Sequence, residues 1–214
     1  MDTSQRDLSE ALDEATQRVI DEVRLLSDSD VRAASLLPGW SRAHVLAHLA
    51  RNADAMRNLL AGAQAGQDRL AYPSAEAREA AINEGAAADA RKLVDDLAAS
   101  AMSLRTVARQ LPAEAWDYPV AMLNSPRFPA SQLLARRLAE VELHHCDLGI
   151  GYGPGQWLAV FSAMELDEPL RALREERAGY VQPESVRARS MAKDIPPYRS
   201  GHPLPGSWLG RRRT

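Results

Sequence analysis

Long runs of apolar residues at helical spacing constrain the fold of this chain more than any other feature of its sequence. In the first run, between Leu8 and Leu26, apolar residues recur at steps of three and four, which places them on one face of a helix. A second run begins after Ser41, a good N-cap residue, and continues to about Leu60. These runs predict amphipathic helices that each bury one face.

The same pattern predicts three more helices farther along the chain. They are expected over about residues 74–110, with Ser74 as the cap, and over about residues 130–148 and 155–178. Polar or Gly- and Pro-containing stretches separate the helices and are expected to be breaks, at about residues 27–30, 62–74 and 111–129.

Composition supports a helical protein. Alanine occurs 37 times and arginine 24 times, whereas aromatic residues make up 5% of the chain. Alanine and arginine favour helices, and strands favour aromatic and β-branched residues. We therefore predict an all-α protein in which four long antiparallel helices form an up-down bundle. Bundles of this kind build metal and cofactor sites from side chains on facing helices.

Several functional classes are disfavoured by the sequence. The formal net charge of −3 argues against a surface that follows nucleic acid. No apolar run approaches the roughly 20 residues that span a bilayer, and the acidic, polar start is unlike a signal peptide. The single cysteine, Cys146, excludes an internal disulfide and a cysteine-only zinc site. We expect a cytoplasmic protein, monomeric or homodimeric, without nucleic-acid or membrane partners.

The C-terminal part of the chain differs from the rest. Residues 171–214 hold ten basic and four acidic side chains, and no clear periodicity continues past Gly179. We interpret this part as a loosely packed extension. The alternative is a basic arm for an anionic partner, with Arg211 to Arg213 at its tip.

Four of the five histidines fall in two clusters on predicted helices. One cluster is His44-Val-Leu-Ala-His48, and the other is Glu140-Val-Glu-Leu-His-His-Cys-Asp147. Residues four apart share a helix face, and zinc accepts imidazole nitrogen and carboxylate oxygen as ligands. One histidine of the first cluster and a Glu-x-x-x-His pair of the second would give a catalytic type of zinc site with one open position.

Two pairs on the fourth helix compete for that role. Glu140 and His144 lie at the edge of the predicted buried stripe of leucines and valine, together with Arg137 and Asp147. Glu142 and His145 form a rival pair on nearly the opposite side of the helix. Periodicity favours the first pair, but interior histidines with ordinary hydrogen bonds and a surface Glu–His ion pair explain the pattern too.

Three sequence blocks carry a family resemblance. LPGWSRAHVLAHLARNADAMRNLL (37–60), YPSAEAREAAINEGA (72–86) and RRLAEVELHHCDLGIGYGPGQW (136–157) resemble the mycothiol-dependent maleylpyruvate isomerases, which have a DinB-like four-helix bundle. The resemblance covers about residues 5–178. It implies a DinB-like metal-binding bundle over residues 1–178 and a short, atypical remnant of a C-terminal domain over residues 179–214.

The resemblance also implies a function and its residues. It implies a zinc enzyme of aromatic catabolism in actinobacteria, which uses mycothiol to convert maleylpyruvate to fumarylpyruvate downstream of gentisate. The metal ligands of the family match His48, Glu140 and His144, and a catalytic arginine in a WLxGR-like stretch matches Arg211 in SWLGRRRT.

Three further residues near the predicted ligands have candidate roles. Asp147 or Arg137 could orient a ligand. Ligating histidines usually donate their second N–H to an acceptor, which the carboxylate of Asp147 provides. A surface ion pair is the alternative interpretation of Arg137. Cys146 is interpreted as a small buried residue.

Two other functions remain open at this point. A mycothiol- or bacillithiol-dependent S-transferase of the same superfamily would need the same three ligands but no arginine that stabilises an enolate. A non-catalytic metal-binding or dimerisation bundle would need neither. The segment before Arg211 does not resemble a strand-bearing domain. Because only the isomerase needs this arginine, the C-terminal part of the chain is the feature that separates the isomerase from the other two possibilities.

Overall fold

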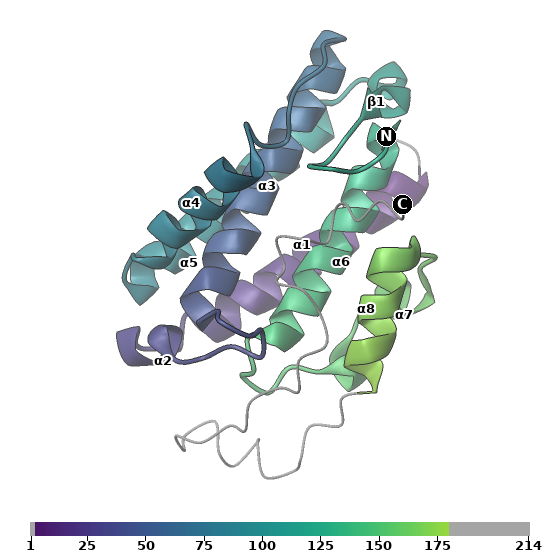
Figure 1. The fold of residues 1–214 in the computed structure, drawn as a ribbon. Helices are drawn as coiled ribbons and strands as arrows, with labels where there is room; N and C mark the ends of the chain where they lie inside the picture. The colour runs from purple at the N-terminus through teal and green to yellow at the C-terminus, as the bar shows by residue number, and fades with distance from the viewer. Residues whose placement is uncertain (1–2, 180–214) are drawn as a thin grey trace, which may run out of the picture.

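Helices dominate the part of the chain that the computed structural model describes, residues 3–179. Four long helices, α1 (Thr3–Val23), α3 (Arg42–Ala65), α5 (Ala90–Gln110) and α6 (Leu133–Asp147), lie side by side along most of their length (Figure 1). In this bundle, α1 and α3 each pack against both α5 and α6. The prediction of an all-α bundle is confirmed.

The apolar faces of these helices meet in one core. Val19 of α1, Leu49 of α3, Leu97 of α5 and Leu138 of α6 are all buried within it. The helix starts also follow the sequence: Ser41 precedes α3, and Ser74 accepts a hydrogen bond from the backbone N–H of Ala77 at the start of α4 (Ala75–Ala86). Capping of this kind satisfies N–H groups that have no partner inside the helix.

The expected continuous helix over residues 74–110 is wrong, because the chain turns between α4 and α5. Asp89 caps α5 by accepting from the N–H of Lys92 at 2.8 Å. The turn is held from another part of the chain: the Arg32 guanidinium donates to the carbonyl oxygens of Ala87 at 2.8 Å and Ala88 at 2.7 Å. Local periodicity could not reveal a corner that depends on this distant arginine.

Arg32 belongs to a short helix in a stretch that its polar residues predict to be a break. Ser27 is the N-cap of helix α2 (Asp28–Arg32) and forms a capping box with Asp30. The Asp28 carboxylate accepts from the N–H of Ala90 at 2.8 Å and so joins this helix to the start of α5. The expected polar break is therefore a structured corner.

Helix α4 packs along the outer side of α3. A Cβ atom on Gly85 would lie 3.1 Å from the Cβ of Ala47, so glycine and alanine together permit the close approach of the two helices. This packing brings the start of α4 near the middle of α3 (Figure 1).

The turn-rich segment before α6 contains small regular elements. They are the 3-10 helices η1 (Ala113–Asp117) and η2 (Ala130–Gln132) and the strands β1 (Pro119–Val120) and β2 (Phe128–Pro129). The strands form a two-residue antiparallel pair, with Pro119 opposite Pro129 and Val120 opposite Phe128.

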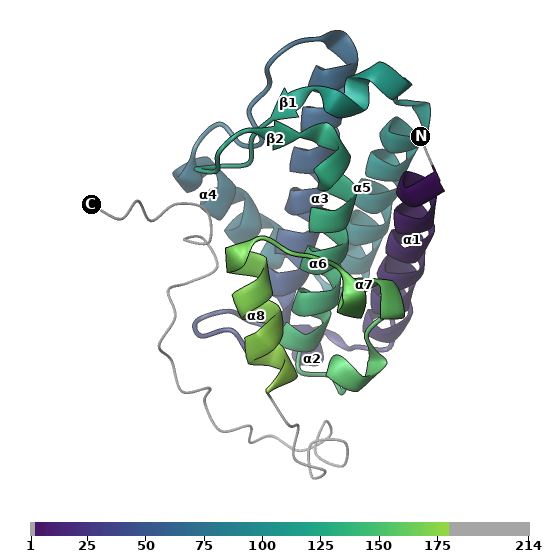
Figure 2. The ribbon, with the colours of Figure 1, turned by 90° about the vertical axis from the view of Figure 1, so that its right-hand side faces the viewer.

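The expected single helix over residues 155–178 is also wrong. The chain instead forms η3 (Pro154–Gln156), α7 (Ala159–Ala163) and α8 (Glu168–Ala178). Pro169 explains the separate start of α8, because proline is tolerated in the first turn of a helix and disrupts its interior. Helices α7 and α8 both pack on α6, on the side shown in Figure 2.

Among the described residues, no helix combines the length and the apolar character needed to span a membrane. Most of the predicted C-terminal remnant, residues 180–214, lies outside the described residues, and Arg211 lies there as well.

Candidate metal centre

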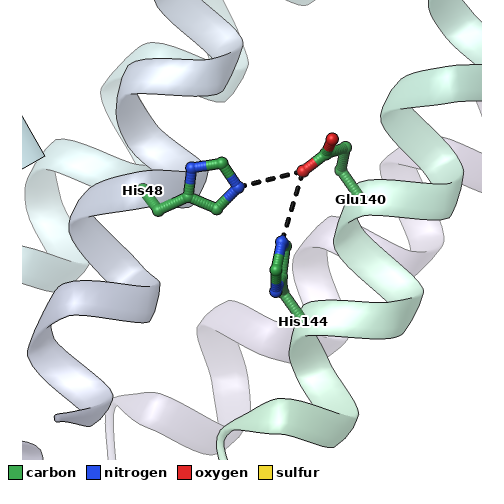
Figure 3. A group of neighbouring side chains, drawn as sticks. All are labelled: His48, Glu140 and His144. Atoms are coloured by element: carbon green, nitrogen blue, oxygen red, sulfur yellow. Dashed lines mark hydrogen bonds and ion pairs between the residues drawn. The ribbon is translucent and has the colours of Figure 1, made fainter. Parts of the chain in front are cut away.

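Three of the predicted ligand residues converge in the seam between α3 and α6. His48 comes from α3, and Glu140 and His144 come from successive turns of α6 (Figure 3). Glu140 Oε2 lies 2.9 Å from His48 Nε2 and 3.3 Å from His144 Nε2. One atom of each side chain lies within 4.8 Å of one atom of each of the others. The structure thus brings together an arrangement of ligand atoms that a single cation could bridge.

The three groups are electrostatically coupled. Burial alone would raise the pKa of Glu140, but hydrogen bonds from His144 and His48 outweigh burial and hold that pKa well below its usual range. Burial lowers the pKa of His48 to about 4, so this imidazole is neutral at physiological pH. The seam therefore offers a carboxylate and a neutral imidazole, both of which are competent metal ligands.

His144 is oriented by the last residue of its own helix. Its Nδ1 lies 2.9 Å from Asp147 Oδ2, while its Nε2 faces Glu140. Burial lowers the pKa of His144, but the hydrogen bonds to Asp147 and Glu140 outweigh it and raise the pKa to about 9. The contact with Asp147 is the type that fixes the ring orientation of metal-bound histidines. Of the two candidates for orienting a ligand, Asp147 and Arg137, it is Asp147 that contacts His144.

Asp147 itself is held from a third helix. Its side chain is fully buried, and its second oxygen, Oδ1, accepts a hydrogen bond of 2.6 Å from Nε of Arg177 on α8. Burial alone would raise the pKa of Asp147, but the hydrogen bond from His144 and the charge of Arg177 outweigh burial and lower that pKa. Asp147 is therefore a carboxylate held between a histidine and an arginine.

Sequence analysis missed Arg78, which contacts the site from α4. Its Nη2 donates to His48 Nδ1 at 3.0 Å, and its guanidinium carbon lies 5.7 Å from the centre of the Tyr72 ring. A signal was available: Arg78, Ile82 and Ala86 recur at four-residue steps and are all buried, so the arginine occupies a position of the apolar stripe.

Arg137 lies one turn before Glu140 on α6, and its side chain donates a hydrogen bond to a residue outside the three. It is buried, and its Nη1 donates to Asn52 Oδ1 at 2.8 Å, which links α6 to α3 one turn away from the contact of His48 with Glu140. Burial lowers the pKa of Arg137 to about 10. The interpretation of this residue as part of a surface ion pair is wrong, because it is 1% exposed.

The rival pair on α6 faces a different set of partners. His145 Nε2 lies 3.0 Å from a carboxylate oxygen of Glu22 on α1, and the His145 ring stacks on Tyr152 with 3.7 Å between ring centres. Glu142 accepts from the hydroxyl of Tyr152 and from the N–H of Leu158. These contacts join α1 and the segment after α6 to α6 itself.

The two remaining candidate residues in the described region lie outside the seam. Cys146 is 4% exposed and its sulfur accepts a 3.3 Å hydrogen bond from the Trp157 ring. Burial raises the pKa of Cys146 to about 12, so the thiol is a poor nucleophile, in agreement with its interpretation as a buried small residue. His44 Nδ1 lies 2.7 Å from Ser41 Oγ, so this histidine is engaged at the start of α3.

Fold and site together define a class of protein: a four-helix bundle with two histidines and one glutamate converging between two of its core helices. The sequence model of one protein family, the mycothiol maleylpyruvate isomerase N-terminal domain, matches residues 12–149. This match covers more than half of the chain and includes His48, Glu140 and His144. The chain belongs to this family.

Two solved structures are similar to this chain. They are the crystal structures of the mycothiol-dependent maleylpyruvate isomerase and of a histidine-to-alanine mutant of that enzyme. Each has 29% sequence identity and a TM-score of 0.70, over 73% of this chain and 65% of the other chain. The match thus spans 65% of the length of that enzyme. Comparison with curated proteins gives no match.

Proposed function

We propose that His48, Glu140 and His144 bind a zinc ion. The convergence of their ligand atoms within 4.8 Å carries this proposal, because two imidazoles and one carboxylate with a position left open form a catalytic type of zinc site. The contact of Asp147 with His144 Nδ1 supports it further, since it leaves Nε2 directed into the seam.

One contact must change when the metal binds. Arg78 donates to His48 Nδ1, so in this arrangement the proton of the neutral ring sits on Nε2, which donates to Glu140. A metal needs the lone pair of Nε2, and the proton of the neutral ring then resides on Nδ1. Arg78 loses its acceptor in that state. Its guanidinium then becomes available to another anion beside the metal site.

We infer that the protein is a mycothiol-dependent isomerase that converts maleylpyruvate to fumarylpyruvate in gentisate catabolism. A carbon–carbon double bond does not rotate freely, so the reaction needs a reversible addition that makes it a single bond. A thiolate adds to the conjugated double bond, the electron pair moves to the carbonyl oxygen, and rotation followed by loss of the thiolate gives the trans product. Bound zinc would supply a position that keeps the mycothiol sulfur as a thiolate at neutral pH.

Arginines of this chain fit the other requirement of the reaction. The substrate carries carboxylates and develops negative charge on oxygen, and the planar guanidinium binds such groups with two parallel hydrogen bonds. Arg78 is in contact with His48 and could bind a carboxylate there. Arg211, assigned by resemblance, is proposed as a second arginine of the reaction.

The test is the loss of maleylpyruvate on zinc-loaded protein, followed with and without mycothiol. We expect turnover only when both zinc and mycothiol are present. Zinc bound at one equivalent without turnover would instead favour a mycothiol S-transferase, which conjugation of the thiol to electrophiles would reveal, or a non-catalytic metal-binding bundle. Failure of the chain to bind zinc would contradict both the proposed zinc site and the activity that depends on it.

Arg211 has matched controls in its own neighbours. Arg211→Ala is expected to lower turnover by about two orders of magnitude or more, as loss of one stabilising group does in other enzymes, while zinc stays bound. Arg212→Ala and Arg213→Ala should leave turnover close to that of the unmodified protein. Equal losses in all three variants would mean that the tail acts through its overall charge.

The cytoplasmic location and the monomeric or dimeric state of the protein stay predictions.

A further inference from the structure

The strongest unexplained feature near the proposed metal centre is a buried cation supplied by α8, the last described helix. Arg177 is 6% exposed, and its Nε donates to Asp147 Oδ1 at 2.6 Å. The other oxygen of the same carboxylate, Oδ2, lies 2.9 Å from His144 Nδ1. Arg177, Asp147 and His144 therefore form a continuous chain of contacts from α8 to a proposed ligand.

Asp147 occupies a position that is unfavourable for an isolated carboxylate. It is the last residue of α6 and is fully buried. The C-terminal end of a helix carries partial negative charge, which repels an anion, and a buried anion needs a compensating partner. Within residues 3–179, the two side-chain oxygens of Asp147 contact His144 and Arg177.

Arg177 both compensates the charge of Asp147 and sets its orientation. Its guanidinium is a cation in direct contact with this buried carboxylate. Its Nε holds Oδ1, so that Oδ2 stays directed at His144 Nδ1. A neutral, metal-bound imidazole keeps its Nδ1–H and can donate it to that oxygen.

We propose that Arg177 is a positioning residue of the metal centre: by holding Asp147, it orients His144 and makes metal affinity depend on the docking of α8 against α6. This inference rests on the proposed metal function of His48, Glu140 and His144. It adds a residue 30 positions beyond Asp147 to the determinants of that site. By linkage, metal binding must in turn favour the docked position of α8.

The test is a double-mutant cycle on the full-length chain, with zinc affinity measured by competition with a chelating dye. Arg177→Gln is expected to weaken zinc binding about tenfold, the lower end of the effect of partners that support a metal ligand. In an Asp147→Asn background the same change should alter affinity by less than about twofold, because the carboxylate through which Arg177 acts is gone.

Arg171→Gln is the matched control on the same helix. Its guanidinium is exposed and pairs with Glu168 and Glu175, away from Asp147, so zinc affinity should stay within about twofold of the unmodified value. If Arg177→Gln fails to fold, as judged by circular dichroism, Arg177→Lys takes its place in the cycle. Lysine keeps the charge but lacks the planar guanidinium, and a loss only in the presence of Asp147 is expected again.

Hydrogen exchange gives a second measurement that does not depend on turnover. Zinc should slow exchange of the α8 amides in the unmodified protein and slow it less in Arg177→Gln. An equal loss of zinc affinity in both backgrounds of the cycle, with and without Asp147, would overturn the inference, and so would no loss in either. If the unmodified protein and His48→Ala bind zinc equally, the proposed metal function fails instead, which is a distinguishable result.

Discussion

Helix α6 presents two opposite faces that carry the same kinds of residues. The His144 face consists of Glu140 and His144, and the His145 face consists of Glu142 and His145. On the His144 face, one oxygen of Glu140 is shared by two imidazoles, His48 and His144. On the His145 face, the carboxylate and the imidazole have separate hydrogen-bond partners in Tyr152 and Glu22.

This difference shows what makes a cluster of ligand-type residues a candidate metal site. A glutamate that accepts from a phenol and a histidine that faces another carboxylate are closed pairs, which already satisfy their polar groups. Two imidazoles that share one carboxylate oxygen place their Nε2 atoms around a common point, where a cation can take the place of the shared protons. Helix α3 supplies the second imidazole to the His144 face, whereas α1 supplies a carboxylate to the His145 face.

The largest expected effect separates the two glutamates. Glu140→Gln should weaken zinc binding by about two to three orders of magnitude, since a binding free energy of about 10–16 kcal/mol is shared by about four ligands. Glu142→Gln should leave zinc affinity within about twofold, because this residue contacts no proposed ligand atom. Isothermal titration calorimetry measures both. Similar losses in the two variants would mean that the faces do not differ as described.

The carboxylates that face the two histidines provide a second contrast. Asp147→Asn should weaken zinc binding about 10- to 100-fold, because the amide is a poorer acceptor for His144 Nδ1. Glu22→Gln changes the corresponding partner of His145 and should have little effect on zinc affinity. The same calorimetric titration applies. A larger loss of zinc affinity for Glu22→Gln than for Asp147→Asn would show that the metal binds on the His145 face and not on the His144 face.

The pH dependence of zinc binding should reflect His144. Its pKa is raised to about 9 by Asp147 and Glu140, against the effect of burial, so the metal must displace a proton at neutral pH. Zinc affinity is therefore expected to rise about tenfold per pH unit below pH 9 and to level off above it. Titrations between pH 6 and pH 9.5 measure this slope. A flat profile over that range would show that His144 is neutral before the metal binds.

The smallest effect on zinc is expected from a change on the His145 face. Tyr152→Phe removes the hydroxyl that donates to buried Glu142, and it should lower the free energy of unfolding by about 1–3 kcal/mol. Zinc affinity should stay within about twofold, because the contacts on the His144 face are intact. Urea unfolding and a zinc titration on the same preparation check both statements. A loss of zinc affinity without a loss of stability would reverse the roles of the two faces.

Much of the bundle could be predicted from local sequence patterns, and the errors have a common cause. The helix starts at Ser41 and Ser74 follow from capping preferences that act within a few residues. The corner between α4 and α5 could not be predicted, because Arg32 and Asp28 hold it from more than 50 residues away. The burial of Arg78 follows from its place on the apolar stripe of α4, but its contact with His48 could not be predicted, since it depends on how α4 packs on α3.

The sequence by itself determined that Glu140 and His144 share one face of a helix and that His48 lies on the buried side of another, because helical periodicity is a local property. Only the tertiary structure decided which pair on α6 receives His48, and it also brought Arg177 to Asp147 and Glu22 to His145. These contacts join residues 30 to 123 positions apart. They depend on how whole helices pack, which no short-range pattern encodes.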